Sequence, residues 1–139
     1  MNGGFGTVAA EVLTIASGSD VVRVRQAARA YGVRAALSLV DQTKLVTAAS
    51  ELARNALVHG GGGVARLEIV SDGRRQGVRA TFVDQGPGIA EIGLALTDGW
   101  ASGGGLGLGL SGSRRLMDAF EIAGEPGLGT TVAVTKWGR

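Results

Sequence analysis

The sequence predicts an α/β protein of the α+β type, a two-layer sandwich in which a mixed β-sheet is covered by helices on one face. Strand-like and helix-like stretches follow each other along the chain, and short turn signals join several of the strand-like stretches. Strands joined in this way pair locally, and the helices between them cover a face of the sheet. With 139 residues the chain has the length of one domain, so we expect a single domain over residues 1–139.

The N-terminal part is predicted to begin with a strand and a helix. Thr7–Ile15 combines β-branched and small residues, which is typical of a strand. Ser19 and Asp20 then offer an N-cap, so we expect a helix over Val21–Tyr31 that ends at Gly32.

A second, longer helix is predicted to begin at Asp41, which would cap it, and to run to His59. Gly60 would follow as the residue after its C-cap. Its apolar side chains recur at helical spacing and are expected to face the core. This stripe consists of Leu45, Ala49, Leu52, Ala53 and Ala56.

The C-terminal half is predicted to contain four strands and a third helix, Leu110–Phe120. Ser71-Asp72-Gly73 is a turn signal between the first two of these strands, and Glu125-Pro126-Gly127 separates the last two. Ile89–Gly105 has weak periodicity and is expected to be a mobile loop. The four strands are Val64–Val70, Val78–Val83, Glu121–Ala123 and Thr130–Trp137.

The composition argues against several classes of function. Without cysteine there can be no disulfide, zinc thiolate or thiol nucleophile. No apolar run approaches the roughly 20 residues of a membrane helix, and Glu11 interrupts the N-terminal apolar stretch, so we expect a cytoplasmic protein with no membrane partner. The net charge is only +2 and aromatic residues make up 4% of the chain, so nucleic acid is not an expected partner.

Glu51 and Asn55 lie four residues apart on the second predicted helix, at the border of its apolar stripe. In one interpretation this is a solvated flank, and Glu51 pairs with Arg54. In the other, the amide oxygen of Asn55 binds Mg²⁺, which prefers oxygen ligands, and the Glu51 carboxylate deprotonates a hydroxyl or a water. The helix alone leaves both interpretations open.

A second polar signal, Asp84-Gln85-Gly86-Pro87-Gly88, follows directly after a predicted apolar strand. It is compatible with a simple turn, because Asp, Pro and Gly all favour turns. It is also compatible with a base-binding site. The carboxylate of Asp84 would then accept a hydrogen bond from an exocyclic amino group such as that of adenine, and the glycines would let the base lie against the backbone.

A third signal is the glycine-dense segment Gly103–Leu110, which precedes the third predicted helix. Glycines at alternate positions before a helix expose backbone N–H groups beside the positive end of the helix dipole, which favours an anion. Gly107, Gly109 and Gly112 also fit the G-x-G-x-x-G dinucleotide pattern, although no strand precedes them. A flexible glycine linker is the remaining interpretation.

The order of these signals resembles a known family. E-x-x-x-N on a helix is followed by D-x-G-x-G after a strand, by G-x-G-x-G-L before a helix, and by Gly129-Thr130 before the last strand. Together they resemble the Bergerat-type ATP-binding fold shared by gyrase, Hsp90, histidine kinases and MutL, the GHKL superfamily. Within it the chain resembles the small bacterial serine/threonine kinases of anti-sigma-factor type. The segments ELARN and RRLMDAF resemble the RsbT family of stressosome switch kinases, and NALVHG resembles the anti-sigma kinases proper.

The resemblance implies a role for each site residue. Glu51 would be the catalytic base, Asn55 would hold Mg²⁺ and Asp84 would bind the adenine amino group of ATP. Gly88 would lie beneath the ring, and Ala90–Gly104 would be a lid. The full set of expected nucleotide-binding residues is Asn55, Asp84, Gly86, Gly88, Gly105, Gly107, Gly109, Leu110 and Thr130.

The resemblance also implies the substrates and partners. ATP with Mg²⁺ would phosphorylate a serine or threonine of a STAS-domain antagonist or scaffold protein in a bacterial stress or sigma-factor pathway. A PP2C-type phosphatase or a sigma factor would be a further partner. Two alternatives stay open, a non-catalytic nucleotide-gated binding module and an NAD-type dinucleotide binder. A self-phosphorylating histidine kinase is disfavoured, because the single histidine, His59, ends the nucleotide helix.

One departure from the family pattern concerns charge. Between Ile89 and Leu110 the chain has no Lys or Arg, whereas relatives commonly place a basic lid residue against the terminal phosphate. Phosphoryl transfer depends on neutralising that charge. We therefore expect weak intrinsic turnover unless a partner completes the site, or Lys44, Arg114 or Arg115 reaches it.

Overall fold

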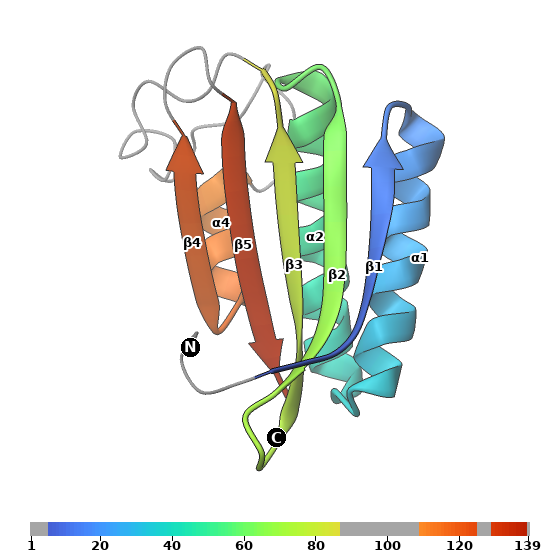
Figure 1. Ribbon diagram of the computed structural model, residues 1–139, viewed down its shortest axis with the longest axis vertical. Coiled ribbons are helices and arrows are strands. Elements are labelled where there is room, and N and C mark those ends of the chain that lie inside the picture. Colours follow the sequence, from blue (N-terminus) through green and yellow to red (C-terminus); the bar gives the residue numbers. More distant parts are fainter. Residues whose placement is uncertain (1–5, 87–108, 125–128, 139) are drawn as a thin grey trace.

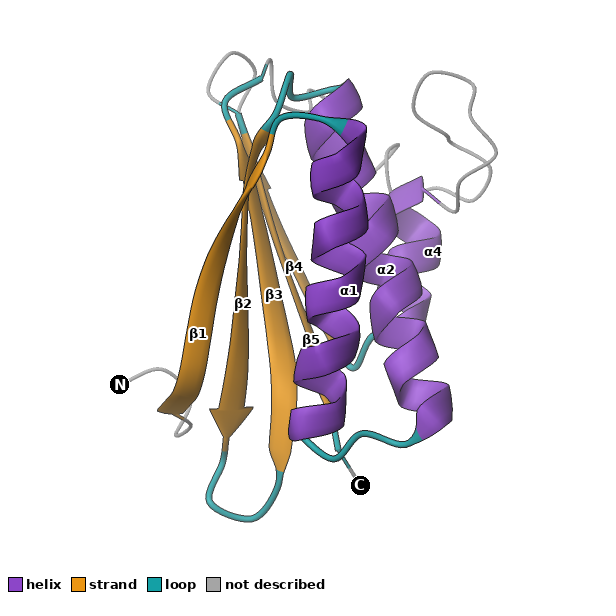
Figure 2. Ribbon diagram, turned by 90° about the vertical axis from the view of Figure 1, so that its right-hand side faces the viewer, coloured by secondary structure: helices purple, strands orange, loops and turns teal. Residues whose placement is uncertain are grey.

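The computed structural model describes residues 6–86, 109–124 and 129–138, which form one five-stranded sheet and a layer of helices. Figure 1 shows α1 beside β1, α2 behind β2 and β3, and α4 behind β4 and β5. Figure 2 shows that all these helices cover the same face of the sheet, which confirms the predicted two-layer α+β sandwich. The elements are β1 Gly6–Ile15, α1 Gly18–Arg34, α2 Leu39–Val58, β2 Gly63–Ser71, β3 Gln76–Asp84, α4 Gly109–Leu116, β4 Ala119–Gly124 and β5 Thr130–Trp137.

The sheet differs from the mixed sheet that the sequence predicted. Its order is β1-β2-β3-β5-β4, and all four neighbouring pairs are antiparallel. β3 and β4 run in the same direction, because α4 leads the chain back between them. They are not neighbours, however, since β5 is inserted between them and pairs with both. The inserted strand therefore turns an expected parallel contact into two antiparallel ones.

The core lies between the sheet and the helices. The predicted apolar stripe of α2 is fully buried there, as its periodicity indicated. These side chains pack against residues of β2, β3 and β5 that point to the helical face. The contributing sheet residues include Leu67, Val78, Ala80, Phe82, Val132 and Val134.

α1 begins and ends beyond the predicted limits. Its N-cap is Ser17, so the Ser19-Asp20 cap was wrong; the Asp20 carboxylate instead accepts a hydrogen bond from the backbone N–H of Ala16 at 2.8 Å. Gly32 is inside the helix rather than after it, and a side chain there would lie close to Gln42 and Leu45 of α2. The helix ends where Ala36 adopts a φ of 61°, and the N–H of Leu37 returns to the carbonyl of Gly32.

α2 is capped by Ser38, whose Oγ accepts a hydrogen bond from the backbone N–H of Asp41. Asp41 is therefore in the first turn rather than at the predicted cap position. It is buried, and its carboxylate lies 3.7 Å from the Nζ of Lys136. His59 is the C-cap, so the predicted end of this helix is confirmed.

α4 is shorter than the predicted helix Leu110–Phe120, because Phe120 already belongs to β4. The Nζ of Lys136, which is only 4% exposed, donates to the last helical carbonyl, that of Leu116, at 3.0 Å. The same ammonium group lies 3.5 Å from the carboxylate of Asp118, which accepts a hydrogen bond from the backbone N–H of Trp137. Lys136 thus ties the first turn of α2 and the end of α4 to β5.

The face of the sheet without helices carries a second charged group. Glu68 on β2 is 4% exposed and binds Arg79 of β3 through two hydrogen bonds of 3.0 and 3.2 Å. Thr7 of β1 donates to the same carboxylate at 2.7 Å. Burial alone would raise the pKa of Glu68, but the hydrogen bonds from Arg79 and Thr7 and the nearby positive charges outweigh it and lower the pKa. This network joins three strands.

The other strands agree with the prediction to within a few residues, and Thr130–Trp137 agrees in full. The predicted turn at Ser71-Asp72-Gly73 is confirmed, with Gly73 at a φ of 88°. The expected loop Ile89–Gly105 and the turn at Glu125-Pro126-Gly127 lie outside the described residues. A helix that could cross a lipid bilayer is not found in the described part of the chain.

Candidate functional site

The candidate site lies at the end of the sheet where β3 ends and β2 and β5 begin. Asp84 pairs with Gly63 on one side and with Thr130 on the other. The C-terminal turn of α2 reaches the same end of the molecule (Figure 1). We call this region the Asp84 end.

The side chain of Asp84 lies against Gly60, immediately after α2. A Cβ on Gly60 would overlap the Cβ and the carboxyl carbon of Asp84. Only a residue without a side chain therefore allows β3 to bring its terminal carboxylate this close to the helix. The Gly60 N–H in turn bonds to the carbonyl of Asn55, so the carboxylate is placed one helical turn from Asn55.

Three further glycines surround the same position. A Cβ on Gly63 would overlap the carbonyl of Val83, and one on Gly86 would overlap the backbone of Gly60. Gly129 has a φ of 88°, and a Cβ there would overlap the carbonyl of Asp84. We call Gly60, Gly63, Gly86 and Gly129 the glycine cradle, because they let the backbone pack closely around the end of β3. Gly60 lies against the Asp84 side chain, and the other three lie against backbone atoms.

One oxygen of the Asp84 carboxylate is held by the chain itself. Its Oδ1 accepts a hydrogen bond from the backbone N–H of Gly86 at 2.9 Å, which confirms that the segment turns here. Among the described residues, no hydrogen bond to Oδ2 is found, so this oxygen can accept a hydrogen bond from a ligand. The turn and the base-binding interpretation are thus compatible, because the turn fixes the carboxylate that a base would use.

Glu51 and Asn55 lie in the C-terminal half of α2, and both are partly exposed, one turn apart. No ion pair joins Glu51 to Arg54 in the described part of the chain, so the solvated-flank interpretation lacks its expected contact. Thr130, also partly exposed, sits directly opposite Asp84 in the sheet. The structure therefore brings Asn55, Asp84, Gly86 and Thr130 to one end, with Glu51 one turn further along the helix.

The phosphate-binding segment is described only at its C-terminal end. Gly109 begins α4, whose N-terminus lies toward the Asp84 end (Figure 1), and α4 packs on α2. The side chain of Leu110 is 3% exposed and belongs to the core, so only its backbone could contact a phosphate. Gly88, Gly105 and Gly107 lie outside the described residues, as does the expected lid Ala90–Gly104.

The basic residues proposed to reach the site do not lie near it. Arg114 and Arg115 are exposed in the last turn of α4, at the end away from Gly109. Lys44 precedes Asn55 by eleven residues of the same helix, which corresponds to about 16 Å. His59 is exposed at the C-cap of α2.

The glycine cradle was missed in part from the sequence. Gly60 was interpreted as a helix terminator and Gly63 was given no role, because a glycine run after a helix is ordinarily a stop signal. Only the contact of Gly60 with Asp84, 24 residues away, shows that this glycine makes room for the carboxylate. The signal that could have found it is the pairing of a glycine run with the later D-x-G.

Comparison with known proteins agrees with this geometry. Residues 40–137 match the family model described as histidine kinase-, DNA gyrase B- and HSP90-like ATPase. The chain is 41% identical over 118 residues to the serine/threonine-protein kinase RsbT of Bacillus subtilis (strain 168), which covers 85% of this chain and 89% of that protein.

Solved structures show a similar fold. The structure of the RsbU and RsbW domains of Rv1364c from Mycobacterium tuberculosis matches 93% of this chain with a TM-score of 0.65 and 24% identity. This chain spans about a third of that larger protein, 32%. The mycobacterial sensor histidine kinase MprB matches 94% of this chain and 99% of its own, with a TM-score of 0.51 and 19% identity.

Proposed function

Because this chain belongs to the histidine kinase-, DNA gyrase B- and HSP90-like ATPase family and is a serine/threonine-protein kinase, we propose that it phosphorylates a STAS-domain protein and acts as a partner switch. The acceptor would be an antagonist or scaffold protein of a bacterial stress or sigma-factor pathway. The observation that supports the nucleotide site best is the glycine cradle around Asp84, at the end of the helix that carries Glu51 and Asn55.

The adenine of ATP fits the cradle chemically. Its exocyclic amino group is a hydrogen-bond donor, and the Asp84 carboxylate has an oxygen that accepts none of the hydrogen bonds found among the described residues. Because Gly60 has no side chain, the Asp84 carboxylate keeps its place beside the end of α2. We therefore assign Asp84, Gly86, Gly88 and Thr130 to the adenine.

The phosphates of ATP are assigned to the start of α4 and the residues before it. Backbone N–H groups at a helix N-terminus are free to donate to an anion, and the helix dipole favours negative charge there. Gly109 is at this position, and the assignment extends to Gly105, Gly107 and the backbone of Leu110. The buried side chain of Leu110 anchors this end of α4 in the core.

Asn55 is the proposed magnesium ligand. Its amide oxygen suits a hard cation, and a bound Mg²⁺ would neutralise phosphate charge during transfer. Within the described residues no three His, Cys, Asp or Glu side chains are grouped to hold a metal ion. The remaining oxygens would therefore come from phosphates and water, as is usual for Mg²⁺ in kinases.

Glu51 is the proposed base. In the transfer, the hydroxyl oxygen of the acceptor forms a bond to the γ-phosphorus, and the bond from that phosphorus to the leaving oxygen of ADP breaks. The hydroxyl proton passes to the Glu51 carboxylate, which is partly exposed and so open to a docked protein. Because Lys44, Arg114 and Arg115 lie away from the site, we expect turnover to be weak until a partner protein supplies positive charge.

The test is phosphorylation of candidate bacterial STAS-domain proteins with labelled ATP–Mg²⁺. We expect Glu51→Gln to lower transfer by about 100-fold or more, since general-base catalysis is worth that factor, while ATP and acceptor still bind. Arg25→Gln is the matched control, because Arg25 is exposed on α1. Unchanged transfer by Glu51→Gln would remove this residue from its role.

The same experiment separates the alternatives. A non-catalytic binding module would bind ATP and its partner but transfer no phosphate even as wild type. A kinase that binds a sigma factor directly would phosphorylate its acceptor and also form a stable complex with the sigma factor. A stress-pathway switch kinase would instead form that complex with a PP2C-type phosphatase. An NAD-type binder would prefer NAD to ATP in calorimetry.

A further inference from the structure

The exposed side of α2 around Glu51 carries three side chains that the nucleotide site does not use. Thr47 precedes Glu51 by four residues, and Arg54 and Val58 follow it by three and seven, so all of them recur at helical spacing. Thr47 and Arg54 are exposed, and Val58 is 58% exposed. We call Thr47, Arg54 and Val58 the Glu51 flank.

The Glu51 flank and Glu51 form one continuous surface. Residues three and four apart on a helix have Cβ atoms about 5–6 Å apart, which places Thr47 and Arg54 directly beside Glu51. Val58 lies about 10 Å further along the axis but is turned by only about 20° from Glu51, since seven residues make nearly two turns. A molecule that contacts Glu51 from outside therefore lies over the flank as well.

A protein acceptor has to come close enough to cover this surface. For proton transfer its hydroxyl must lie within about 2.6–3.2 Å of the Glu51 carboxylate. A standard protein–protein interface covers about 800 Å² of each partner, which extends beyond the nearest neighbours Thr47 and Arg54. The Glu51 flank is therefore buried in any complex in which Glu51 acts as the base on a folded acceptor.

The helices that carry Glu51 and the phosphate-binding end are basic. Of the two acidic residues of α2 and α4, Asp41 is buried beside Lys136, and the other is Glu51 itself. No hydrogen bond or ion pair of the Arg54 guanidinium is found among the described residues, and its charge is open to a partner. An acidic acceptor surface complements these helices. Their basic residues are Lys44, Arg54, Arg114 and Arg115.

We propose that the Glu51 flank binds the acceptor segment that carries the phosphorylated serine or threonine, and that Arg54 recognises an acidic side chain of this segment. Val58 contacts an apolar side chain of the same segment. In an extended segment, which spans about 3.3–3.6 Å per residue, the acidic residue lies about two positions from the phosphorylated one. The inference rests on the proposed function, because it requires Glu51 to act on a protein hydroxyl.

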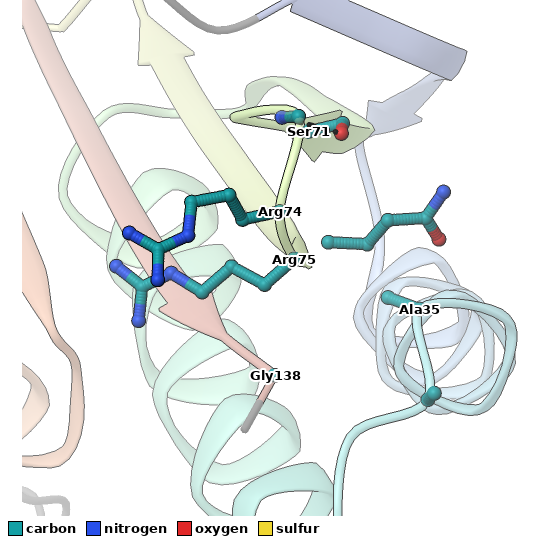
Figure 3. A pocket seen from close by; sticks show the side chains of 8 residues that line it. Ala35, Ser71, Arg74, Arg75 and Gly138 are labelled. Atoms are coloured by element: carbon teal, nitrogen blue, oxygen red, sulfur yellow. Dashed lines mark hydrogen bonds between the residues drawn. The ribbon is translucent and has the colours of Figure 1, made fainter.

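A hollow near the start of α2 is too far from Glu51 to hold this segment. Figure 3 shows it between Ala35, at the end of α1, and the β2–β3 hairpin, which carries Arg74 and Arg75. Its volume is about 430 Å³. α2 begins at Leu39, close after this hollow, and Glu51 lies twelve residues or about 18 Å further along the helix. Arg74, which is exposed, therefore serves as a control for Arg54.

The first test compares Arg54→Glu with Arg74→Glu, which change the net charge equally. For a STAS-domain protein that the wild type phosphorylates, Arg54→Glu should raise the KM of the acceptor about tenfold and keep kcat within about threefold, because repulsion replaces attraction. Arg74→Glu should leave both values within about twofold of wild type, since distant exposed charges are screened. Equal KM values for the two variants would overturn the proposal.

ATP affinity, measured by calorimetry, separates acceptor binding from nucleotide binding. It should stay within about threefold of wild type in Arg54→Glu, because Arg54 is turned by about 100° around the helix from Asn55. A loss of ATP affinity as large as the rise in KM would show that Arg54 acts on the nucleotide, and the proposal would be wrong.

An exchange of charges identifies the acidic partner of Arg54. Acidic residues within about three positions of the phosphorylated one are replaced by lysine in the acceptor, one at a time. One of these acceptors should be a poorer substrate than the native one for the wild type and a better one for Arg54→Glu. An acceptor without an acidic residue in this range, or no such reversal, would contradict the proposal.

The apolar contact is tested by Val58→Ser, with Val22→Ser as its control. Val22 is also an exposed helical valine, 45% exposed, but it belongs to α1. Val58→Ser should raise the KM of the acceptor about threefold through lost apolar burial, and Val22→Ser should not. Equal KM values in the two serine variants would exclude Val58 from the docking surface.

The outcomes separate this inference from the proposed function. If the wild type phosphorylates no STAS-domain protein, the proposed function and this inference both fail. If the wild type phosphorylates one and Arg54→Glu does so with an unchanged KM, the proposed function stands and only the inference is wrong.

Discussion

The Asp84 end and the opposite, hairpin end of the sheet differ in the kind of residue that shapes them. At the Asp84 end, four glycines let the backbone pack closely around the end of β3, and one of them, Gly60, lies against the Asp84 side chain. At the other end, contacts between charged side chains hold the elements together. Lys136 forms ion pairs with Asp41 and Asp118. Arg75 contacts Asp72 and the ring of Trp137. The Asp84 end is shaped by residues without side chains, and the hairpin end by paired charged side chains. We therefore expect substitutions at the Asp84 end to change nucleotide binding, and substitutions at the hairpin end to change stability.

Among substitutions that test this comparison, Lys136→Met is expected to have the largest effect, a loss of stability. The substitution removes the buried ammonium group that lies 3.7 Å from the Asp41 carboxylate and 3.5 Å from the Asp118 carboxylate, and so breaks both ion pairs. We expect the free energy of unfolding to fall by about 3 kcal/mol, measured by urea denaturation. ATP affinity of the folded protein should change by less than about threefold.

Lys44→Met is the control for this variant, because Lys44 is on α2 but contributes to no ion pair found in the described part of the chain. Its unfolding free energy should remain within about 0.5 kcal/mol of wild type. If the two lysine variants lost similar amounts of unfolding free energy, the ion pairs of Lys136 would not be what stabilises the hairpin end.

A smaller effect, on ATP affinity rather than on stability, is expected from Gly60→Ala. The new Cβ would overlap the Asp84 side chain and displace the carboxylate from its place beside α2. We expect ATP affinity, measured by calorimetry, to fall at least about tenfold, which corresponds to roughly 1.4 kcal/mol. Gly18→Ala is the matched control, because a Cβ there meets open space. Equal ATP affinity in both variants would contradict the role of the cradle.

The smallest effect concerns the network on the open face. At pH 7, Glu68→Gln should lower the unfolding free energy by about 1 kcal/mol, because Arg79 and Thr7 lose their charged acceptor. The folded pKa of Glu68 lies below its usual value of 4.5, so this stabilisation is present above that pH and is lost as the pH falls through the folded pKa.

The measurement is the difference in unfolding free energy between wild type and Glu68→Gln across the acid range. The two proteins should converge at acid pH. A constant difference at every pH would show that the substitution acts through packing rather than through the charge.

Features of the fold that depend on residues close together in the sequence were predicted correctly. The apolar stripe of α2 follows from helical periodicity, and the strand Thr130–Trp137 from its β-branched residues. The helix starts were misplaced because Ser17, Ser19 and Asp20, like Ser38 and Asp41, are competing cap residues within one turn. The sequence alone does not rank them.

Features that depend on distant contacts were not predictable. α4 ends at Leu116, whose carbonyl accepts a hydrogen bond from Lys136, twenty residues later. Gly32 lies inside α1 and faces α2, where a side chain would be in close contact with Gln42. The order of the site motifs still identified the Asp84 end, since a strand that ends in a carboxylate and a helix that ends in glycine both mark the same end of the sheet.

The position of β5 has a consequence for how the protein is made. The last strand along the chain is an inner strand of the sheet and is the partner of both β3 and β4. During synthesis, β3 therefore presents an unsatisfied edge, and β4 has no strand to join, until Thr130–Trp137 has left the ribosome. A nascent chain that stalls before this point exposes unpaired backbone groups of β3, which can pair with strands of other chains. The sheet of this domain is therefore complete only after β5 has been translated.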